Sequence, residues 1–169
     1  MNTVLIRLIM AGILDDIHQL DPIDRRIVAE LQRDASLSHA ELATRVASSP
    51  ASVWRRIRAL EQAGVLRGSV RLVDAHRLGY RVNVLCNIRV RSHAIEVRTA
   101  FEDFVRSRPE ILECFSMSGE WDYLLRVVAR DVSDYENFLM RTLLGQPSVA
   151  TASSHFALSL TKHSTALPL

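Results

Sequence analysis

The stretch 37–64 constrains the fold most, because it predicts two short helices joined by a tight turn. Ser38 and Glu41 have the spacing of a capping box at the start of the first helix. Ser49 and Pro50 mark the start of the second, because a serine hydroxyl caps a first turn and proline is tolerated at its first position. The short turn forces the two helices to cross sharply, as in a helix-turn-helix.

The second helix divides into an apolar stripe and a basic face. The stripe recurs at helical spacing and consists of Val53, Ile57 and Leu60. Gly64 suits a left-handed helix end. The remaining face carries three arginines, whose guanidinium groups match phosphates and the O6 and N7 atoms of guanine. We therefore expect this helix to enter a groove of double-stranded DNA.

The expected DNA-binding residues lie around the start and the basic face of this helix: Ser38, Ser49, Pro50, Ala51, Ser52, Trp54, Arg55, Arg56 and Arg58. Arg55 is the best candidate for guanine recognition. Trp54 adjoins the apolar stripe, so core packing is favoured for it over contact with a sugar or a methyl group. The alternative for Arg56 and Arg58 is that they only keep a surface helix soluble.

An upstream helix completes a three-helix unit. Asp21 and Pro22 mark its start, and its apolar stripe consists of Ile23, Ile27, Val28 and Leu31. After Gly64, apolar residues at Val70, Leu72 and Val73 predict a strand that leaves the unit, as a wing would. The predicted organisation is an extension over 1–19, a helix-turn-helix domain over 20–66, a strand linker over 67–80 and a second domain over 81–169.

The charge is distributed unevenly, although the net charge is only +2. Residues 21–71 contain nine arginines against six acidic residues, whereas residues 81–169 contain ten basic and ten acidic residues. The positive excess therefore coincides with the predicted helix-turn-helix, as binding to phosphates requires.

The remaining parts of the chain exclude several other classes of site. The apolar segment 4–17 is interrupted by charges and is too short to span a bilayer, so a helical extension is favoured. Cys86 and Cys114 have no close spacing and are expected as buried free thiols. The six histidines show no metal-ligand spacing, so no metal site is expected. Neither a phosphate-binding glycine loop nor a nucleophile elbow is found.

The second half alternates between strand and helix patterns in the order strand, helix, strand, strand, helix, strand. The strands are expected from residue 82, at 112–118, at 123–129 and at 149–161, and Ser133 with Glu136 predicts the cap of the second helix. This order predicts a ferredoxin-like βαββαβ domain with both helices on one face, and hence an α+β protein. Leu85, Met117 and Phe156 are candidates for the uncovered sheet face, which would bind a partner subunit.

From 20 to the end, the chain resembles the leucine-responsive regulatory protein (Lrp/AsnC) family of transcription regulators. The residues that carry the resemblance are Leu20-Asp21, Asp24, Leu42-Ala43, Ser49 to Gly64, Gly79-Tyr80, Pro109, Gly119-Glu120, Asp122-Tyr123, Lys162 and Leu167-Pro168-Leu169. The turn departs from the family pattern, because Ala47-Ser48-Ser49 stands where members often have Gly-Leu-Ser.

The resemblance implies a winged helix-turn-helix joined to an effector-binding domain that forms homodimers, often assembled into tetramers or octamers in the cytoplasm on the nucleoid. It places an amino acid or related metabolite, with no cofactor, near Met117, Ser118, Gly119, Glu120, Trp121, Asp122 and Tyr123. Asp122 would pair with an amino group, while backbone amides near Gly119 would hold a carboxylate. An ordinary hairpin turn is the alternative for this loop.

Two other functions remain open from the sequence. Siroheme decarboxylases resemble the same two-domain fold, but no catalytic cluster of histidine and arginine stands out here. A DNA-architectural protein with weak sequence preference would carry the same helix-turn-helix. The favoured function is a sequence-specific regulator that responds to an amino acid.

Overall fold

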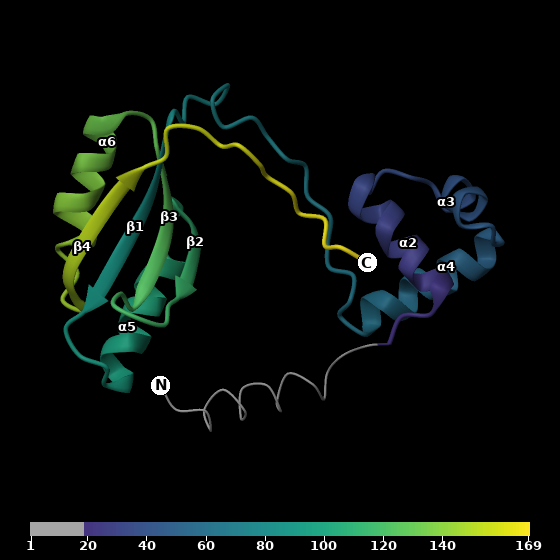
Figure 1. Cartoon of the computed structure of the whole chain (residues 1–169), viewed down its shortest axis with the longest axis horizontal. Coiled ribbons are helices and arrows are strands. Elements are labelled where there is room, and N and C mark those ends of the chain that lie inside the picture. Colours follow the sequence, from purple (N-terminus) through teal and green to yellow (C-terminus); the bar gives the residue numbers. More distant parts are fainter. Residues whose placement is uncertain (1–18) are drawn as a thin grey trace. The chain divides into compact units, whose positions relative to one another are not determined.

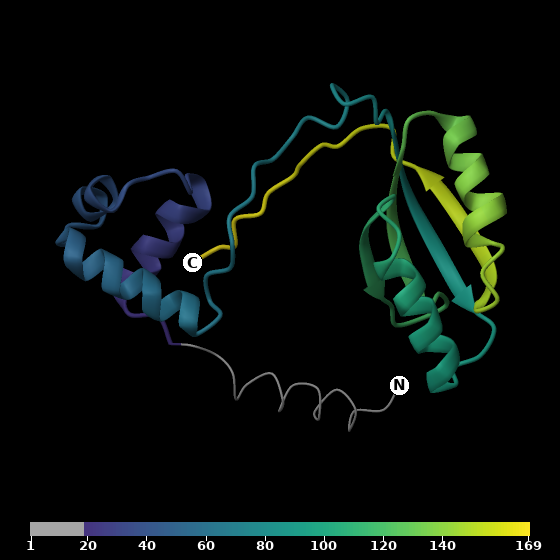
Figure 2. The ribbon, with the colours of Figure 1, turned by 180° about the vertical axis from the view of Figure 1, so that it is seen from behind.

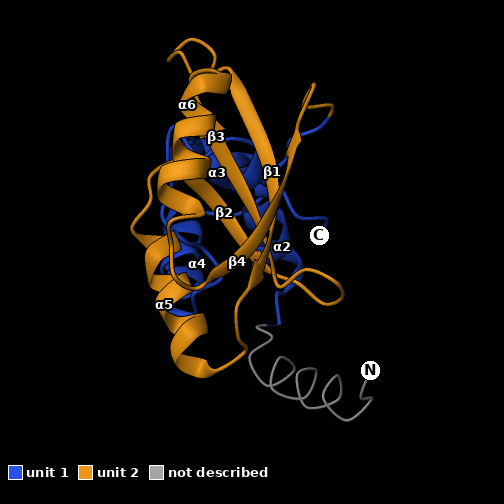
Figure 3. Cartoon of the chain, turned by 90° about the vertical axis from the view of Figure 1, so that its left-hand side faces the viewer, with its two compact units in different colours: residues 1–71, 162–169 blue, residues 72–161 orange. Residues whose placement is uncertain are grey.

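The computed structural model describes residues 19–169, so the expected extension lies outside the described residues except for Gln19. The chain divides into two compact units, blue and orange in Figure 3. The helical unit contains the residues up to 71 together with 162–169, and the sheet unit contains 72–161. The tail 162–169, expected in the second domain, makes its contacts with the helical unit.

Three capped helices form the helical unit: α2 (Pro22–Arg33), α3 (His39–Val46) and α4 (Pro50–Gln62). Each N-cap is the expected one. Asp21 accepts hydrogen bonds from the backbone N–H groups of Ile23 and Asp24. Ser38 and Glu41 form the capping box, and Ser49 accepts from the N–H of Ser52 at 3.2 Å. These bonds satisfy amides that a helix start leaves unpaired.

The three helices share one apolar core. Its buried members are Ile27, Val28, Leu42, Ala43, Val46, Val53 and Leu60. All three predicted stripes contribute to it, with Ile57 partly buried at its edge. Ala47 ends α3 in the left-handed conformation, with φ of 52°, and Gly64 follows α4 with φ of 70°. The turn of the helix-turn-helix thus places an alanine where glycine is the easier fit.

The segment after α4 differs from the prediction. Residues 67–80 contain no strand, only a turn over 75–79, so the expected strand at Val70, Leu72 and Val73 is wrong. The side chains of these three residues are at least 70% exposed. An extended segment becomes a strand only when its N–H and C=O groups pair with a neighbour, and this segment has no such partner within residues 19–169.

The sheet unit has the ferredoxin-like topology that the sequence predicts (Figure 1). Its strands are β1 (Val82–Val90), β2 (Ile111–Ser116), β3 (Tyr123–Ala129) and β4 (Val149–Phe156), all antiparallel in the order β2-β3-β1-β4. The last strand ends at Phe156 rather than at the expected residue 161. Beyond it, the backbone N–H of Ala157 still donates to the carbonyl of Asn83 on β1 at 2.8 Å, and residues 158–161 form no strand.

Helices α5 (Ile95–Arg106) and α6 (Val132–Asn137) lie on the same face of the sheet, as the view from behind in Figure 2 shows. Asp131 caps α6, in place of the expected Ser133, because its carboxylate accepts from the N–H of Asp134 at 2.8 Å. The helix continues as a π-helical segment, η1 (Phe138–Leu143). Alternate residues of β1 and β3 pack beneath these helices in a single core.

The opposite sheet face carries apolar side chains that nothing in the described chain covers. Leu85 is 40% exposed and Phe115 is 50% exposed, and Leu85 pairs with Arg126 across the sheet on this face. Phe156 was expected here but lies on the helix side, because it pairs with the buried Val84 and packs edge-on against Tyr135 at 5.4 Å. Because successive side chains of β4 point to opposite faces of the sheet, Phe156 faces the helices.

Both cysteines are free thiols, as expected, but only Cys86 on β1 is buried, whereas Cys114 on β2 is partly buried. Burial raises the pKa of Cys86 and raises the pKa of Cys114 to about 11, which keeps both thiols protonated. No helix within residues 19–169 is long and apolar enough to cross a membrane. Over the same residues, no cluster of three potential metal ligands is found.

The C-terminal tail is tied to α2 by one side chain. The amide of Gln32 donates to the carbonyl of Leu167 at 3.3 Å and accepts from the N–H of Leu167 at 2.7 Å. A side-chain amide thus bonds both backbone groups of one residue, as a neighbouring strand would. This pair of bonds, the tail clasp, fastens residues from the end of the sequence to the helical unit.

Candidate functional site

Helix α4 exposes a compact surface at its N-terminal half. A shallow hollow of about 660 Å³ is lined by Ser49, Ala51, Ser52, Trp54 and Arg55. All five belong to the set expected at the DNA, so the structure brings these predicted residues together. Short side chains at the start of a helix permit close approach of a backbone or base edge, and the hollow is open to a flat partner.

Two arginines beside this surface have guanidinium groups that are exposed and could bind a phosphate. Arg55 is exposed, and the side chain of Arg58 is 61% exposed with one hydrogen bond to Glu61 at 3.2 Å. An exposed pair of this kind contributes little stability and exchanges readily for a phosphate. Arg55 and Arg58 therefore present guanidinium groups beside the hollow.

Arg56 departs from the expectation. Its guanidinium bonds Asp21 at 2.6 Å and Asp24 at 2.8 Å, and its side chain is only 24% exposed. Its hydrogen bonds to the carboxylates of Asp24 and then Asp21 raise its pKa. Because the two carboxylates belong to the N-cap and the first turn of α2, Arg56 fixes α4 against α2. Its neighbour in sequence, Arg55, points outward.

Trp54 also departs from the expectation, because it does not pack in the core. Its side chain is 51% exposed, and the guanidinium carbon of Arg58 lies 5.9 Å from its ring centroid. The core positions next to it are already filled by Val53 and Ile57. Ser38 and Pro50 remain at the helix starts, where Ser38 is occupied by its capping box.

The second candidate site lies at the hairpin between β2 and β3. Gly119 adopts φ of 119°, a left-handed conformation that favours glycine, and the N–H of Met117 donates to the carbonyl of Asp122 at 2.8 Å. Glu120 and Trp121 turn toward Arg89, whose guanidinium bonds Glu120 at 3.1 Å and lies 5.2 Å from the Trp121 ring. This end of the loop faces β1 rather than a cavity.

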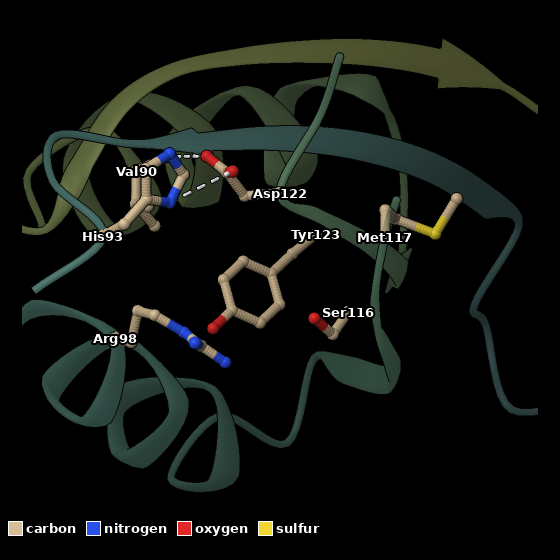
Figure 4. A pocket seen from close by; sticks show the side chains of 7 residues that line it. All are labelled: Val90, His93, Arg98, Ser116, Met117, Asp122 and Tyr123. Carbon is tan, nitrogen blue, oxygen red and sulfur yellow. Dashed lines mark hydrogen bonds and ion pairs between the residues drawn. The ribbon is translucent and has the colours of Figure 1, made fainter. Parts of the chain in front are cut away.

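Asp122 is held in place at the other end of the loop. Its Oδ2 accepts from the backbone N–H of Val90 at 2.8 Å, and its Oδ1 lies 3.6 Å from Nδ1 of His93. One carboxylate oxygen is thus committed to the fold, while the other borders the space between His93 and Tyr123 (Figure 4).

Tyr123 forms the floor of that space. Its hydroxyl donates to Glu102 at 2.9 Å, and its ring packs on Phe101 at 4.7 Å. Burial raises the pKa of Tyr123, and the neighbouring guanidinium of Arg98 partly opposes that effect. The phenol therefore stays neutral and offers a fixed polar group between α5 and the sheet.

Together these residues line a pocket of about 220 Å³. Its walls are Val90, His93, Arg98, Ser116, Met117, Asp122 and Tyr123 (Figure 4). Met117, Asp122 and Tyr123 were expected, whereas Ser118, Gly119, Glu120 and Trp121 do not line it. Sequence reasoning missed the other four residues, and only the family's loop position pointed to this end of the sheet. Met117, predicted for the open sheet face, borders this pocket and is 43% exposed.

The pocket brings charges of both signs to one small space. Asp122 borders it from the hairpin, and Arg98 reaches it from the first turns of α5. Among residues 19–169, no carboxylate forms an ion pair with Arg98. An arginine binds carboxylates through two parallel N–H donors, and an aspartate accepts from an ammonium group. The arrangement suits a small zwitterion.

Comparison with known proteins assigns a family to both units. Residues 83–167 match the Lrp/AsnC ligand binding domain, and residues 20–67 match a winged helix-turn-helix DNA-binding domain. The chain is 35% identical over 150 residues to the DNA-binding transcriptional activator DecR of Escherichia coli K12, covering 89% of this chain and 99% of that protein. It is 36% identical over 148 residues to the leucine-responsive regulatory protein of the same strain, covering 88% and 90%.

Solved structures give the same result. A transcriptional regulator from Neisseria meningitidis in complex with L-Met superposes with a TM-score of 0.85 at 36% identity, over 89% of this chain and 97% of that chain. An AsnC family regulator from Agrobacterium tumefaciens has a TM-score of 0.84 at 40% identity, over 88% and 97%. This chain belongs to the Lrp/AsnC family and is a transcriptional regulator with a helix-turn-helix for DNA and a separate ligand-binding domain.

Proposed function

We propose that this regulator binds a free α-amino acid between Asp122 and Arg98, and that the bound amino acid changes its affinity for specific operators. The observation that carries the proposal is the pairing of a carboxylate and a guanidinium group across one 220 Å³ pocket. Arg98 would hold the ligand's carboxylate, and Oδ1 of Asp122 would accept from its ammonium group. In this proposal Arg98, rather than the backbone amides near Gly119 expected from the sequence, binds the carboxylate.

The apolar lining suggests the class of amino acid. Val90 and Met117 border the same pocket, so the ligand's side chain would be aliphatic or a thioether. The relative from Neisseria meningitidis was crystallised with L-Met, which makes L-Met the first ligand to test. L-Leu and L-Glu form the comparison series, because they vary the shape and charge of the side chain.

On the DNA side, we propose that Arg55, Arg58 and the hollow formed by Ser49, Ala51, Ser52 and Trp54 contact the operator. A second helix of a helix-turn-helix enters the major groove with its N-terminal residues at the base edges. The proposed assembly is a homodimer, or a tetramer or octamer built from such dimers, acting on chromosomal DNA in the cytoplasm. A dimer would place two copies of α4 about one helical turn apart on a palindromic site.

Association would use the open sheet face. Leu85 and Phe115 expose apolar surface there, and the Arg126–Glu113 ion pair at 3.1 Å lies beside them. Burial of this surface against a second copy would remove it from water. Ligand binding would then shift the balance between assemblies and so change which operators are occupied.

Calorimetric titration of the full chain with L-Met, L-Leu and L-Glu tests the ligand site. Asp122→Asn keeps an oxygen for the N–H of Val90 but removes the charge, so we expect at least a tenfold loss of affinity. Glu120→Gln is the matched control, because Glu120 lies in the same loop but outside the pocket. Equal affinity in wild type and Asp122→Asn would remove Asp122 from the ligand site.

The same variants test the coupling. With an operator selected from random duplexes, the ligand that binds should change wild-type operator affinity and leave that of Asp122→Asn unchanged. A ligand that binds tightly but leaves operator affinity and assembly size unaltered would contradict the regulatory part of the proposal.

A further inference from the structure

Trp54 is a large apolar side chain on the surface that faces the proposed operator. It is 51% exposed, whereas the adjacent Val53 is fully buried. A single exposed apolar residue is common on protein surfaces, so exposure alone carries no argument. Its surroundings do: it borders the hollow with Ser52 and Arg55, in the half of α4 that approaches base edges.

The ring is positioned rather than loose. The guanidinium group of Arg58, one turn further along α4, lies over it with its central carbon 5.9 Å from the ring centroid. Arg58 therefore holds one side of the indole by a cation–π contact. The rest of the exposed ring remains available to a partner that also binds the guanidinium groups of Arg55 and Arg58.

The charges around Trp54 identify that partner as DNA. Arg55 and Arg58 flank the ring. Arg55 is exposed, and the ion pair of Arg58 with Glu61 is also exposed to solvent. In the major groove, the apolar group on a base edge is the C5-methyl group of thymine, and arginine's partner is guanine. An indole beside an arginine on one helix face is thus complementary to a thymine beside a guanine.

We propose that Trp54 is a specificity-determining residue, whose indole contacts the C5-methyl group of a thymine next to the guanine that Arg55 binds. The proposal rests on the proposed operator binding by α4. It assigns sequence discrimination to an apolar contact, and it gives Arg58 a second part, as the group that orients the ring.

The test removes one methyl group at a time. Operators are selected from random duplexes with the full-length chain, and each thymine is then replaced singly by uracil, which keeps the base pair and deletes only the methyl group. We expect one position in each half-site to lose roughly fourfold in affinity, the effect of burying one methyl group.

The variants assign that loss to Trp54. In Trp54→Ala and in Trp54→Gln, thymine and uracil operators should bind equally at that position. Trp121→Phe is the matched control, because Trp121 belongs to the sheet unit, and it should keep the full discrimination. Circular dichroism establishes that each variant retains its helices.

Several outcomes would overturn the proposal. Uracil substitution could be neutral at every position in wild type, or its effect could persist in Trp54→Ala. Trp54→Ala could weaken operator and random DNA by the same factor, which would indicate contact with the sugar-phosphate backbone. It could instead alter only the assembly size, which would indicate a protein partner. Failure of operator binding itself appears separately, as a wild-type chain that selects no sequence.

Discussion

Helix α4 presents its proposed DNA-contact residues from one continuous element, whereas the pocket proposed for the ligand draws its walls from β1, α5 and the β2–β3 hairpin. The helix surface is shallow and positive, suited to a long charged partner that arrives already folded. The pocket is small and carries both charges, and any ligand inside it bridges elements that are distant in sequence. A surface formed by one helix keeps its shape when a partner binds. A pocket formed by several elements allows a bound small molecule to change how those elements contact one another.

The two units also differ in how protons act on them. In the described part of the chain, the carboxyl pKa values that the fold lowers belong to Asp21, Asp34 and Glu41, all in the helical unit. A backbone hydrogen bond from Asp24 is the main cause at Asp21, and the hydroxyl of Ser38 is the main cause at Glu41. In the sheet unit, burial instead raises the pKa of Tyr123 and of Cys114.

The first expected effect is therefore that the two units lose stability at opposite ends of the pH range. A lowered carboxyl pKa adds stability above the ordinary value near 4, and that stability is lost as pH falls through the folded pKa. A raised thiol pKa adds stability below the ordinary value of 9.0, lost for Cys114 as pH rises toward about 11. Acid should destabilise the helices first, and alkali the sheet.

Each unit holds one tryptophan, which makes this measurable. Fluorescence of Trp121→Phe reports on Trp54 in the helical unit, and fluorescence of Trp54→Phe reports on Trp121 in the sheet unit. Urea unfolding of both variants should be compared at pH 7, below pH 4 and above pH 9. If both units lost the same stability below pH 4 and again above pH 9, the proposed difference between the units in their response to pH would be contradicted.

The next effect in size separates two neighbouring arginines. Arg55→Ala should weaken operator binding by about 1–3 kcal/mol, roughly fivefold to 150-fold, and should relax sequence preference at one position. Ligand affinity should not change, because Arg55 and the pocket belong to different units. Gel-shift titration over a salt series measures affinity and slope together.

Arg56→Met is the informative control for Arg55→Ala. It removes the bonds to Asp21 and Asp24, so the helical unit should melt at a lower temperature. Below that temperature, the dependence of operator affinity on salt should match wild type, since no phosphate contact is lost. A shallower salt slope in Arg56→Met would return this arginine to the DNA surface.

A smaller effect concerns the turn. Ala47 holds φ of 52°, which costs a residue with a side chain roughly 1–2 kcal/mol. Ala47→Gly should stabilise the helical unit by about 1 kcal/mol, reduced by the larger entropy of glycine in the unfolded chain. Ala59→Gly, an exposed position within α4, should destabilise it by about 1 kcal/mol. Thermal melts followed by Trp54 fluorescence compare the two variants. If both substitutions changed the stability in the same direction, the strain inferred at Ala47 would be contradicted.

The smallest effect concerns the tail clasp. Gln32→Ala removes both bonds to Leu167, and because the site is exposed the loss should stay below about 1 kcal/mol. Hydrogen exchange at the Leu167 amide should accelerate, while Gln62→Ala should leave it unchanged. An unaltered exchange rate in Gln32→Ala would show that the tail is held by other contacts.

The sequence predicted the helical unit well because its signals are local. Caps at Asp21, Ser38 and Ser49 lie within a few residues of the amides they satisfy, and the apolar stripes repeat within each helix. The strand order of the sheet unit was predicted for the same reason, from alternation within each segment. Phe156 was misassigned because the side that a strand residue faces depends on its register with β1.

The errors share one cause. The ion pairs of Arg56 with Asp21 and Asp24 were not foreseen, because they span more than thirty residues of sequence. Trp54 was assigned to the core because a stripe defined by spacing does not show how much room the core leaves. Arg98 and His93 were missed because nothing near them in sequence marks them, and only folding brings α5 and β1 to the hairpin.

The tail clasp means that the DNA-binding half of this protein is not a continuous stretch of sequence. A recombinant fragment that stops at residue 71 would contain all three helices but would leave Gln32 without Leu167. Footprints or affinities measured on such a fragment would describe a truncated module. Expressing 19–71 with a synthetic peptide of 162–169 would restore the missing piece.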